Sequence, residues 1–115
     1  MIVCVLDDLM FSIKIRSAAK LLGAEVYFER TPGMAVERIR EKQPTLAIFD
    51  LNSVKLQPLD AISALKADPQ TRAVPTLGFV SHVHAELIAA ARQAGIDEVL
   101  ARSAFVERLP ELLRR

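Results

Sequence analysis

Five short apolar segments, each followed by a longer stretch with helical spacing, constrain the fold of this 115-residue chain more than any other feature. They are residues 2–6, 24–28, 45–49, 76–80 and 98–100. The first and third segments are almost continuously apolar, which is typical of strands that are covered on both faces. The sequence therefore predicts strands inside a sheet that has helices above and below it.

The stretches between the predicted strands carry apolar residues three and four positions apart, which favours amphipathic helices. We expect helices over residues 10–22, 32–42, 59–68, 85–94 and 105–113. Gly23 and Gly95 end the first and the fourth of these helices. Thr31 followed by Pro32 predicts the N-cap and the first position of the second helix. Pro110 either kinks the last helix or starts its regular part.

The strand–helix unit occurs five times without a hairpin signal, and this predicts an α/β fold. Parallel strands need crossover connections, and such crossovers place helices on both faces of the sheet. The chain has 115 residues, of which 51% are hydrophobic, and this suffices for one core. We therefore expect residues 1–115 to form a single domain.

The charge balance argues against a nucleic-acid or membrane partner, because 15 basic and 14 acidic residues leave a net charge of only +1. The first apolar segment meets Asp7 too soon to be a signal peptide or a membrane span. Cys4 is the single cysteine and lies within that segment. We therefore expect a buried thiol, no internal disulfide and a reducing, cytoplasmic environment.

Polar residues stand at the carboxyl ends of four predicted strands, where ligands bind in folds of this kind. Asp7 and Asp8 follow the first strand, Asp50 ends the third, and Ser81 and Arg102 follow the fourth and fifth. Three carboxylates at one place repel one another unless a hard divalent cation, commonly Mg²⁺, bridges them. Arg102 would compensate further and could hold an anion. The alternative is that each residue is a solvated strand end without a function.

Other chemical signals are weak. His82 and His84 follow the fourth strand, but an alternating His pair without a cysteine is a weak metal signal, and we expect both to be solvated. No GxGxxG or GxxxxGK[ST] spacing is present, so no phosphate loop is expected. The lack of a nucleophile and base pair and of tryptophan disfavours a catalytic or flavin-binding domain. We therefore expect that the protein is not an enzyme.

Four stretches carry a family resemblance that covers the whole chain. They are VLDD, the apolar segment ending in FD, LKADPQTRAVP and AARQAGIDEVLAR. Together with the five strand–helix units, they resemble the receiver domain of bacterial response regulators. The resemblance implies a flavodoxin-like, doubly wound, five-stranded parallel sheet in the order 2-1-3-4-5, with helices on both faces.

The resemblance also assigns roles to the strand-end residues. In that family the aspartate of strand three is phosphorylated by a histidine kinase, so Asp50 is the phosphoacceptor position. Asp7, Asp8 and Asp50 would hold Mg²⁺ together with the backbone carbonyl of Asn52. Arg102 stands in place of the strand-five lysine that contacts the phosphoryl group, and it keeps the charge on a planar fork.

Other positions depart from the family's pattern. The strand-four hydroxyl that contacts the phosphoryl group falls on Val80 without a gap, or on Ser81 after a one-residue shift, and the sequence leaves both readings open. Val99 stands where the family has an aromatic switch residue. Ser103 replaces the proline that usually carries a cis peptide bond, so no such bond is expected. The loop SVKLQP, which follows Asn52, also differs from the family's usual sequence.

The resemblance therefore predicts a stand-alone, atypical response regulator receiver of two-component phosphorelay signalling. It would accept phosphate from a histidine kinase or phosphotransfer protein and act on an effector protein. The contact surface, which could also form a homodimer, would be the face of the fourth helix, fifth strand and fifth helix, with Ala89, Ala90, Arg92 and Phe105. The alternative is a pseudo-receiver, a protein-interaction module that signals independently of phosphorylation.

Overall fold

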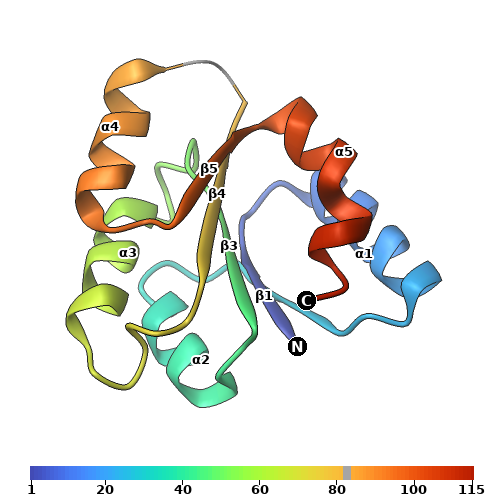
Figure 1. The fold of residues 1–115 in the computed structure, drawn as a ribbon, viewed down its shortest axis with the longest axis horizontal. Coiled ribbons are helices and arrows are strands. Elements are labelled where there is room, and N and C mark those ends of the chain that lie inside the picture. The colour runs from blue at the N-terminus through green and yellow to red at the C-terminus, as the bar shows by residue number, and fades with distance from the viewer. Residues whose placement is uncertain (82–83) are drawn as a thin grey trace.

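The computed structural model describes residues 1–81 and 84–115 and shows one five-stranded sheet flanked by helices (Figure 1). The strands are β1 (Ile2–Val5), β2 (Val26–Glu29), β3 (Leu46–Asp50), β4 (Thr76–Val80) and β5 (Glu98–Ala101). The helices are α1 (Leu9–Leu22), α2 (Ala35–Lys42), α3 (Pro58–Ala67), α4 (Ala85–Ala94) and α5 (Arg102–Leu112). Neighbouring strands pair in parallel in the order β2-β1-β3-β4-β5, which confirms the flavodoxin-like topology.

Successive side chains of each central strand point to opposite faces, and this divides the core into two layers. Val5 and Phe49 lie in a cluster that includes residues of α2, α3 and α4. Cys4 and Ile48 lie in a second cluster with residues of α1 and α5. Figure 1 shows the same division, with α1 and α5 on one side of the sheet and the other three helices opposite. Both faces are thus covered, as the apolar strands require.

The thiol of Cys4 is fully buried, as expected, and burial raises its pKa to about 12. A thiol of this kind is a small apolar core group rather than a nucleophile. Among the described residues, no helix is long and apolar enough to cross a membrane.

The predicted start of the second helix is wrong. The helix α2 begins at Ala35, and its N-cap is Met34 rather than Thr31. The Thr31 carbonyl accepts a turn hydrogen bond from the Met34 N–H, and the Thr31 N–H donates to a carboxylate oxygen of Glu29 at 3.0 Å. Gly33 adopts a φ of 80°, a left-handed conformation that a helix does not accommodate. The Thr-Pro signal therefore marks a turn before the helix.

The last helix also begins earlier than the apolar spacing predicts. The helix α5 starts at Arg102 and runs through Pro110, which therefore lies inside the helix rather than at its start. Because of this early start, Arg102 directly follows β5 and is the first residue of α5, which packs on the same face of the sheet as α1.

Gly78 in β4, beside the strand β3 that ends at Asp50, lies so close to neighbouring side chains that it leaves no room for a side chain of its own. A Cβ atom at this position would lie 2.7 Å from the Leu51 side chain and 2.8 Å from the Ile96 side chain. Both neighbours are buried in the core layer that includes residues of α3 and α4, so neither has free space to move into. The absence of a side chain at Gly78 therefore allows Leu51 to pack immediately after Asp50.

We expect Gly78→Ala to lower the free energy of unfolding by about 1–3 kcal/mol, because the added methyl group overfills a closed part of the core. Urea unfolding followed by circular dichroism measures the change. Ser17→Ala, at an exposed position of α1, is the control and should stay within about 0.5 kcal/mol of the parent chain. A Gly78→Ala chain as stable as the parent would contradict the close approach.

Candidate functional site

The residues singled out at the strand ends lie at one edge of the sheet. Asp7 and Asp8 connect β1 to α1, Asp50 is the last residue of β3, Ser81 follows β4, and Arg102 begins α5. Because all five strands are parallel, their carboxyl ends meet at the same edge. Hydrogen bonds and one ion pair join these residues and their neighbours into one polar cluster.

Asp50 is half-buried and carries an unfavourable negative charge. Burial raises the pKa of its carboxyl group above the ordinary value, and the neighbouring carboxylates of Asp7 and Asp8 raise this pKa further. A hydrogen bond from the Asn52 N–H to Asp50 Oδ1, 3.0 Å long, and the positive charge of Arg102 lower the pKa, but the net shift is upward. Asp50 is therefore a carboxylate whose surroundings favour additional positive charge.

Asp7 and Asp8, which follow β1, each accept a hydrogen bond from a neighbouring part of the chain. The Ser53 hydroxyl donates to Asp7 Oδ1 at 3.0 Å, which ties β1 to the loop after Asp50. Asp8 is the N-cap of α1, and its Oδ1 accepts a hydrogen bond from the Phe11 N–H at 3.0 Å. The N-cap contact stabilises the first turn of α1 and fixes where this carboxylate points.

Arg102 spans the site from the other side. Its Nη2 lies 3.5 Å from Asp8 Oδ2, and its Nη1 donates to the Ser81 hydroxyl at 3.3 Å. The guanidinium carbon lies 3.9 Å from the centre of the Phe11 ring, within the range of a cation–π interaction. Phe11 in turn packs against Phe79 and Phe105, so Arg102 rests on an aromatic cluster.

The structure distinguishes the two possible hydroxyl positions. Val80 is buried in the core layer that includes residues of α3 and α4, whereas Ser81 is exposed and its hydroxyl contacts Arg102. The Ser81 N–H also donates to the side-chain oxygen of Asn52 at 2.7 Å. Of the two residues, Ser81 is the one whose polar atoms lie at the site.

The sequence missed three contributions to this cluster. Ser53 anchors Asp7, the side chain of Asn52 binds the Ser81 backbone, and Phe11 supports Arg102. Phe11 has the spacing of a core residue of α1, and it is indeed 4% exposed. The spacing does not show that the guanidinium of Arg102, from the other end of the chain, stacks on its ring.

The remaining expectations about this edge have mixed outcomes. His84 is the N-cap of α4, where its Nδ1 accepts the Leu87 N–H at 3.2 Å, while His82 lies outside the described residues. No peptide bond in residues 1–81 and 84–115 is cis, so the bond before Ser103 is trans, as expected.

Phe105 is fully buried in the aromatic cluster, and its predicted part in a contact surface is therefore wrong. Ala89 and Arg92 of α4 are exposed.

The donors at this edge suit a hard divalent cation in their chemistry. The carboxylates of Asp7, Asp8 and Asp50 and the backbone carbonyl of Asn52 are oxygen ligands of the kind that Mg²⁺ prefers. Burial and the neighbouring carboxylates of Asp7 and Asp8 raise the pKa of Asp50, so added positive charge here would favour its ionised form. As the side chains stand, no three acidic, His or Cys groups of the described residues lie close enough together to hold a metal ion. Ser53 and Arg102 bind two of the donors instead.

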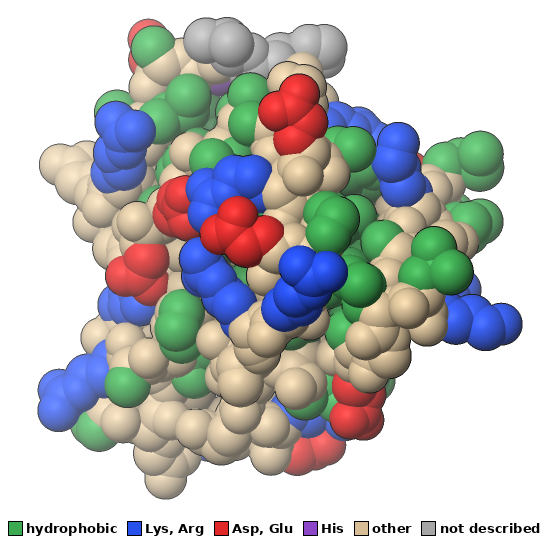
Figure 2. Space-filling view, turned by 45° about the vertical axis from the view of Figure 1, so that its right-hand side comes forward, with side chains coloured by type: hydrophobic (Ala, Val, Ile, Leu, Met, Phe, Trp, Pro, Cys, Tyr) green, Lys and Arg blue, Asp and Glu red, His purple; other side chains and the backbone are tan. Residues whose placement is uncertain are grey.

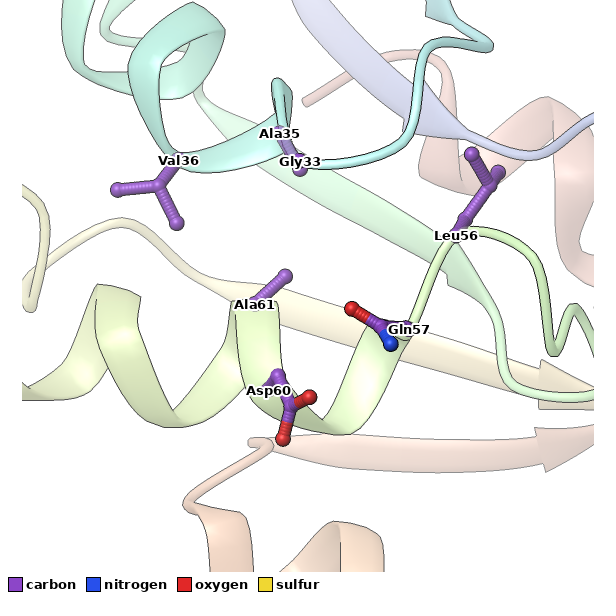
Figure 3. Close-up of a pocket in the computed structure, with 7 residues that line it drawn as sticks. All are labelled: Gly33, Ala35, Val36, Leu56, Gln57, Asp60 and Ala61. Atoms are coloured by element: carbon purple, nitrogen blue, oxygen red, sulfur yellow. The ribbon is translucent and has the colours of Figure 1, made fainter.

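The surface has two hollows near this edge of the sheet. The first is separate from the polar cluster, and the second borders it at Ser53. One, of about 180 Å³, lies between the start of α2 and the first turn of α3, and its lining is largely apolar (Figure 3). The other, of about 290 Å³, lies along the loop after β3 and reaches Leu87 of α4. Asp60 is the one charged residue of each lining. Neither hollow gathers groups that could perform chemistry.

Comparison with known proteins places the fold. No protein-family model matches the sequence, and no curated protein matches it significantly. Among solved structures, a response regulator from Hahella chejuensis is 17% identical with a TM-score of 0.83, covering 98% of this chain and 92% of that one. The receiver domain of the sensor histidine kinase PA1611 from Pseudomonas aeruginosa PAO1, with a magnesium ion in its active-site cleft, is 21% identical with a TM-score of 0.84, covering 99% and 93%. The phosphorylated cyanobacterial phytochrome response regulator RcpA is 19% identical with a TM-score of 0.78, covering 98% and 88%.

These similarities extend over nearly the whole chain and confirm that it has the fold of the receiver domain, as the sequence motifs predict. At such low identity they establish the fold, while the chemistry of the site depends on this chain's own residues.

The charge of Asp50 should make the protein less stable as the pH rises. Since folding raises the pKa of this group, the folded chain binds the proton more tightly than the unfolded chain does. Stability is therefore lost as the pH rises from the ordinary pKa through the raised one. We expect Asp50→Asn to stabilise the chain at pH 7 by up to about 1 kcal/mol, a modest value because solvent screens a half-exposed group.

The comparison is made by urea unfolding at pH 7 and pH 3. At pH 3 the carboxyl group is largely protonated, so the difference between Asp50→Asn and the parent chain should nearly disappear. Asp60→Asn, which neutralises an exposed aspartate of α3, is the control and should show no such stabilisation. An Asp50→Asn chain that is less stable than the parent at pH 7 would show that Asp50 does not carry repulsive charge.

Proposed function

We propose that this protein is a receiver of two-component signalling that accepts a phosphoryl group on Asp50. The observation that carries the proposal is the position of Asp50, which ends β3 half-buried at the sheet edge, near the carboxylates of Asp7 and Asp8 and the cation Arg102. Burial and the two carboxylates raise the pKa of Asp50, which supports the proposal. Perturbed carboxyl groups of this kind, at the carboxyl ends of parallel strands, are candidates for chemistry rather than for structure alone.

The transfer step needs a nucleophile, a leaving group and charge neutralisation. A carboxylate oxygen of Asp50 attacks the phosphorus atom, and a P–O bond forms as the P–N bond of a donor phosphohistidine breaks. The electron pair of the broken bond stays on the imidazole nitrogen, which takes up a proton from solvent. Asp50 thereby becomes an acyl phosphate, and the site's task is positioning and electrostatic stabilisation.

In this proposal Asp7, Asp8, Asp50 and the backbone carbonyl of Asn52 would hold Mg²⁺. When bound, the ion supplies positive charge against the carboxylates and the incoming phosphoryl oxygens. The structure of the receiver domain of PA1611, which contains magnesium in its active-site cleft, supports this assignment by analogy of fold.

Arg102 and Ser81 are the proposed phosphoryl contacts. The guanidinium is a planar fork that suits phosphate oxygens, and its Nη1 already donates to the Ser81 hydroxyl. Both groups are at least partly exposed at the same edge as Asp50, which supports a role in binding the transferred group.

The proposal includes partners on both sides of the transfer step. The donor would be a histidine kinase or a phosphotransfer protein, and the output would be binding of an effector protein or of a second copy. The exposed Ala89 and Arg92 of α4 support a contact surface on the face of α4, β5 and α5. We propose that residues 1–115 act as one receiver-like domain in the cytoplasm, with no catalytic activity beyond accepting phosphate.

A second candidate is a pseudo-receiver that binds its partner whether or not Asp50 is phosphorylated. Two observations favour it. Val80, which is the gapless match to the family's hydroxyl position, is buried, and Val99 stands where the family has the aromatic residue that reports phosphorylation. If this candidate holds, an effector captured by the parent chain is bound equally well by Asp50→Asn, with and without Mg²⁺.

Phosphorylation is tested with acetyl phosphate and Mg²⁺, followed by intact-mass spectrometry. We expect the parent chain to gain the mass of one phosphoryl group, because Asp50 displaces acetate from the donor. Asp50→Asn should show no adduct, since an amide is a poor nucleophile.

The matched control is Asp60→Asn, which removes an exposed aspartate and should leave the adduct unchanged. Chelation of Mg²⁺ should abolish or strongly slow modification of the parent chain. If no adduct forms on the parent chain, or if the adduct survives in Asp50→Asn, Asp50 is not the acceptor under these conditions.

A further inference from the structure

Arg102 is bound by three groups from separate parts of the fold. Asp8 at the start of α1 faces its Nη2, Ser81 after β4 accepts from its Nη1, and the ring of Phe11 lies under the guanidinium. The side chain of Arg102 is only 37% exposed. The cation is therefore held at the acidic edge of the sheet rather than extended into solvent.

The position of Arg102 conflicts with occupation of the acidic pair by a metal ion. One oxygen of Asp8 accepts the Phe11 N–H, and the other faces the guanidinium. Both oxygens of this carboxylate are thus engaged by the chain itself. A divalent cation that takes Asp8 as a ligand competes with the guanidinium, because two cations beside the same carboxylate repel each other.

We propose that Arg102 is a built-in counter-cation that competes with Mg²⁺ for Asp8, so that metal binding and release of Arg102 from Phe11 are one event. The inference rests on the proposed function, because it concerns the same metal site, and it adds a regulatory role for Arg102. In the resting state the guanidinium compensates the acidic edge, and in the metal-bound state it becomes free to reach an incoming phosphoryl group.

The consequence reaches beyond the site, because Arg102 joins two helices. It is the first residue of α5, while Asp8 and Phe11 belong to the N-cap and first turns of α1. Phe11 also contacts Phe79 of β4 and Phe105 of α5, with ring centres 5.0 Å and 5.8 Å apart. Release of Arg102 therefore removes a contact between α1 and α5 and exposes one face of the aromatic cluster.

The helix α1 also carries large apolar side chains that are exposed to water. Leu9, Met10 and Ile13 of α1 are 63%, 77% and 53% exposed. Figure 2 is turned toward the side that carries α1 and α5, and it shows hydrophobic side chains exposed beside Lys, Arg, Asp and Glu.

The strength of the competition is modest. The distance of 3.5 Å between Arg102 and Asp8 is long for an ion pair, and both side chains are more than one third exposed, so solvent weakens their attraction. The stacking on Phe11 adds a comparable contribution at a partly exposed position. Together these contacts correspond to a weakening of Mg²⁺ binding by about tenfold. By linkage, Mg²⁺ must weaken the hold on Arg102 by the same factor.

The test is a Mg²⁺ titration of the full chain followed by NMR, with the dissociation constant taken from backbone amide shifts. We expect Arg102→Gln to bind Mg²⁺ about tenfold more tightly than the parent chain. Arg108→Gln is the matched control, because it removes the same charge from α5 at a residue paired with Glu98 and should leave affinity unchanged within about twofold. In the parent chain, the side-chain Nε–H signal of Arg102 should shift with the same midpoint as the amide of Asp8.

A second variant separates the specific contact from the loss of charge. Phe11→Leu keeps every charge and removes only the ring beneath Arg102, so we expect it to bind Mg²⁺ about threefold more tightly. If Phe11→Leu does not fold, Arg102→Lys takes its place, because lysine keeps the charge without the planar stacking on Phe11 and should also bind Mg²⁺ more tightly than the parent.

The outcomes separate this inference from the proposed function. Equal Mg²⁺ affinity of the parent and Arg102→Gln overturns the competition but leaves the metal site in place. No Mg²⁺ binding by either chain overturns both the metal site and the competition. Tighter binding by Arg102→Gln without any change in Phe11→Leu or its replacement means that charge alone acts, and this overturns the role of the aromatic contact. Phosphorylation of Asp50 is measured separately by mass spectrometry.

Discussion

The parallel pairing of β1 with β3 is the constraint on which the candidate site depends. The register places Val5 beside Phe49, so the residues that follow β1 emerge next to the end of β3. Asp7 and Asp8 are thereby brought to Asp50, although more than forty residues separate them in the chain. Three negative charges at one sheet edge repel one another. The surrounding structure stabilises two of them: Ser53 donates a hydrogen bond to Asp7, and Asp8 is bound by the N-terminus of α1 and by Arg102.

Arg102 links this electrostatic problem to the packing of the core. Its guanidinium compensates part of the charge, while its face rests on Phe11 and so on the aromatic cluster between α1, β4 and α5. Arg102 therefore contacts both the charged sheet edge and the core beneath it. A change of charge at the edge acts directly on the contact between α1 and α5.

The strands, the layer order and the edge at which chemistry gathers follow from local signals. The apolar runs, their β-branched content and the absence of hairpin turns are properties of neighbouring residues, so they can be recognised without the fold. The start of α2 could not be predicted in this way. Thr31 and Pro32 resemble a helix start, but the left-handed Gly33 and the hydrogen bond from Thr31 to Glu29 turn the chain first. The burial of Phe105 was missed because apolar spacing shows that a residue has a buried face without showing how completely that face is covered.

The sequence by itself determined that this protein has five parallel strands, and that Asp7, Asp8, Asp50, Ser81 and Arg102 stand at their carboxyl ends. These are consequences of periodicity and of residue type at strand ends, which are local. The tertiary structure decided that Ser81 rather than Val80 presents its side chain at the site, and that Arg102 binds Asp8, Ser81 and Phe11. Such choices depend on strand register and on which helices cover which face, and residues distant in the chain are brought within a few ångströms only when the whole sheet has formed.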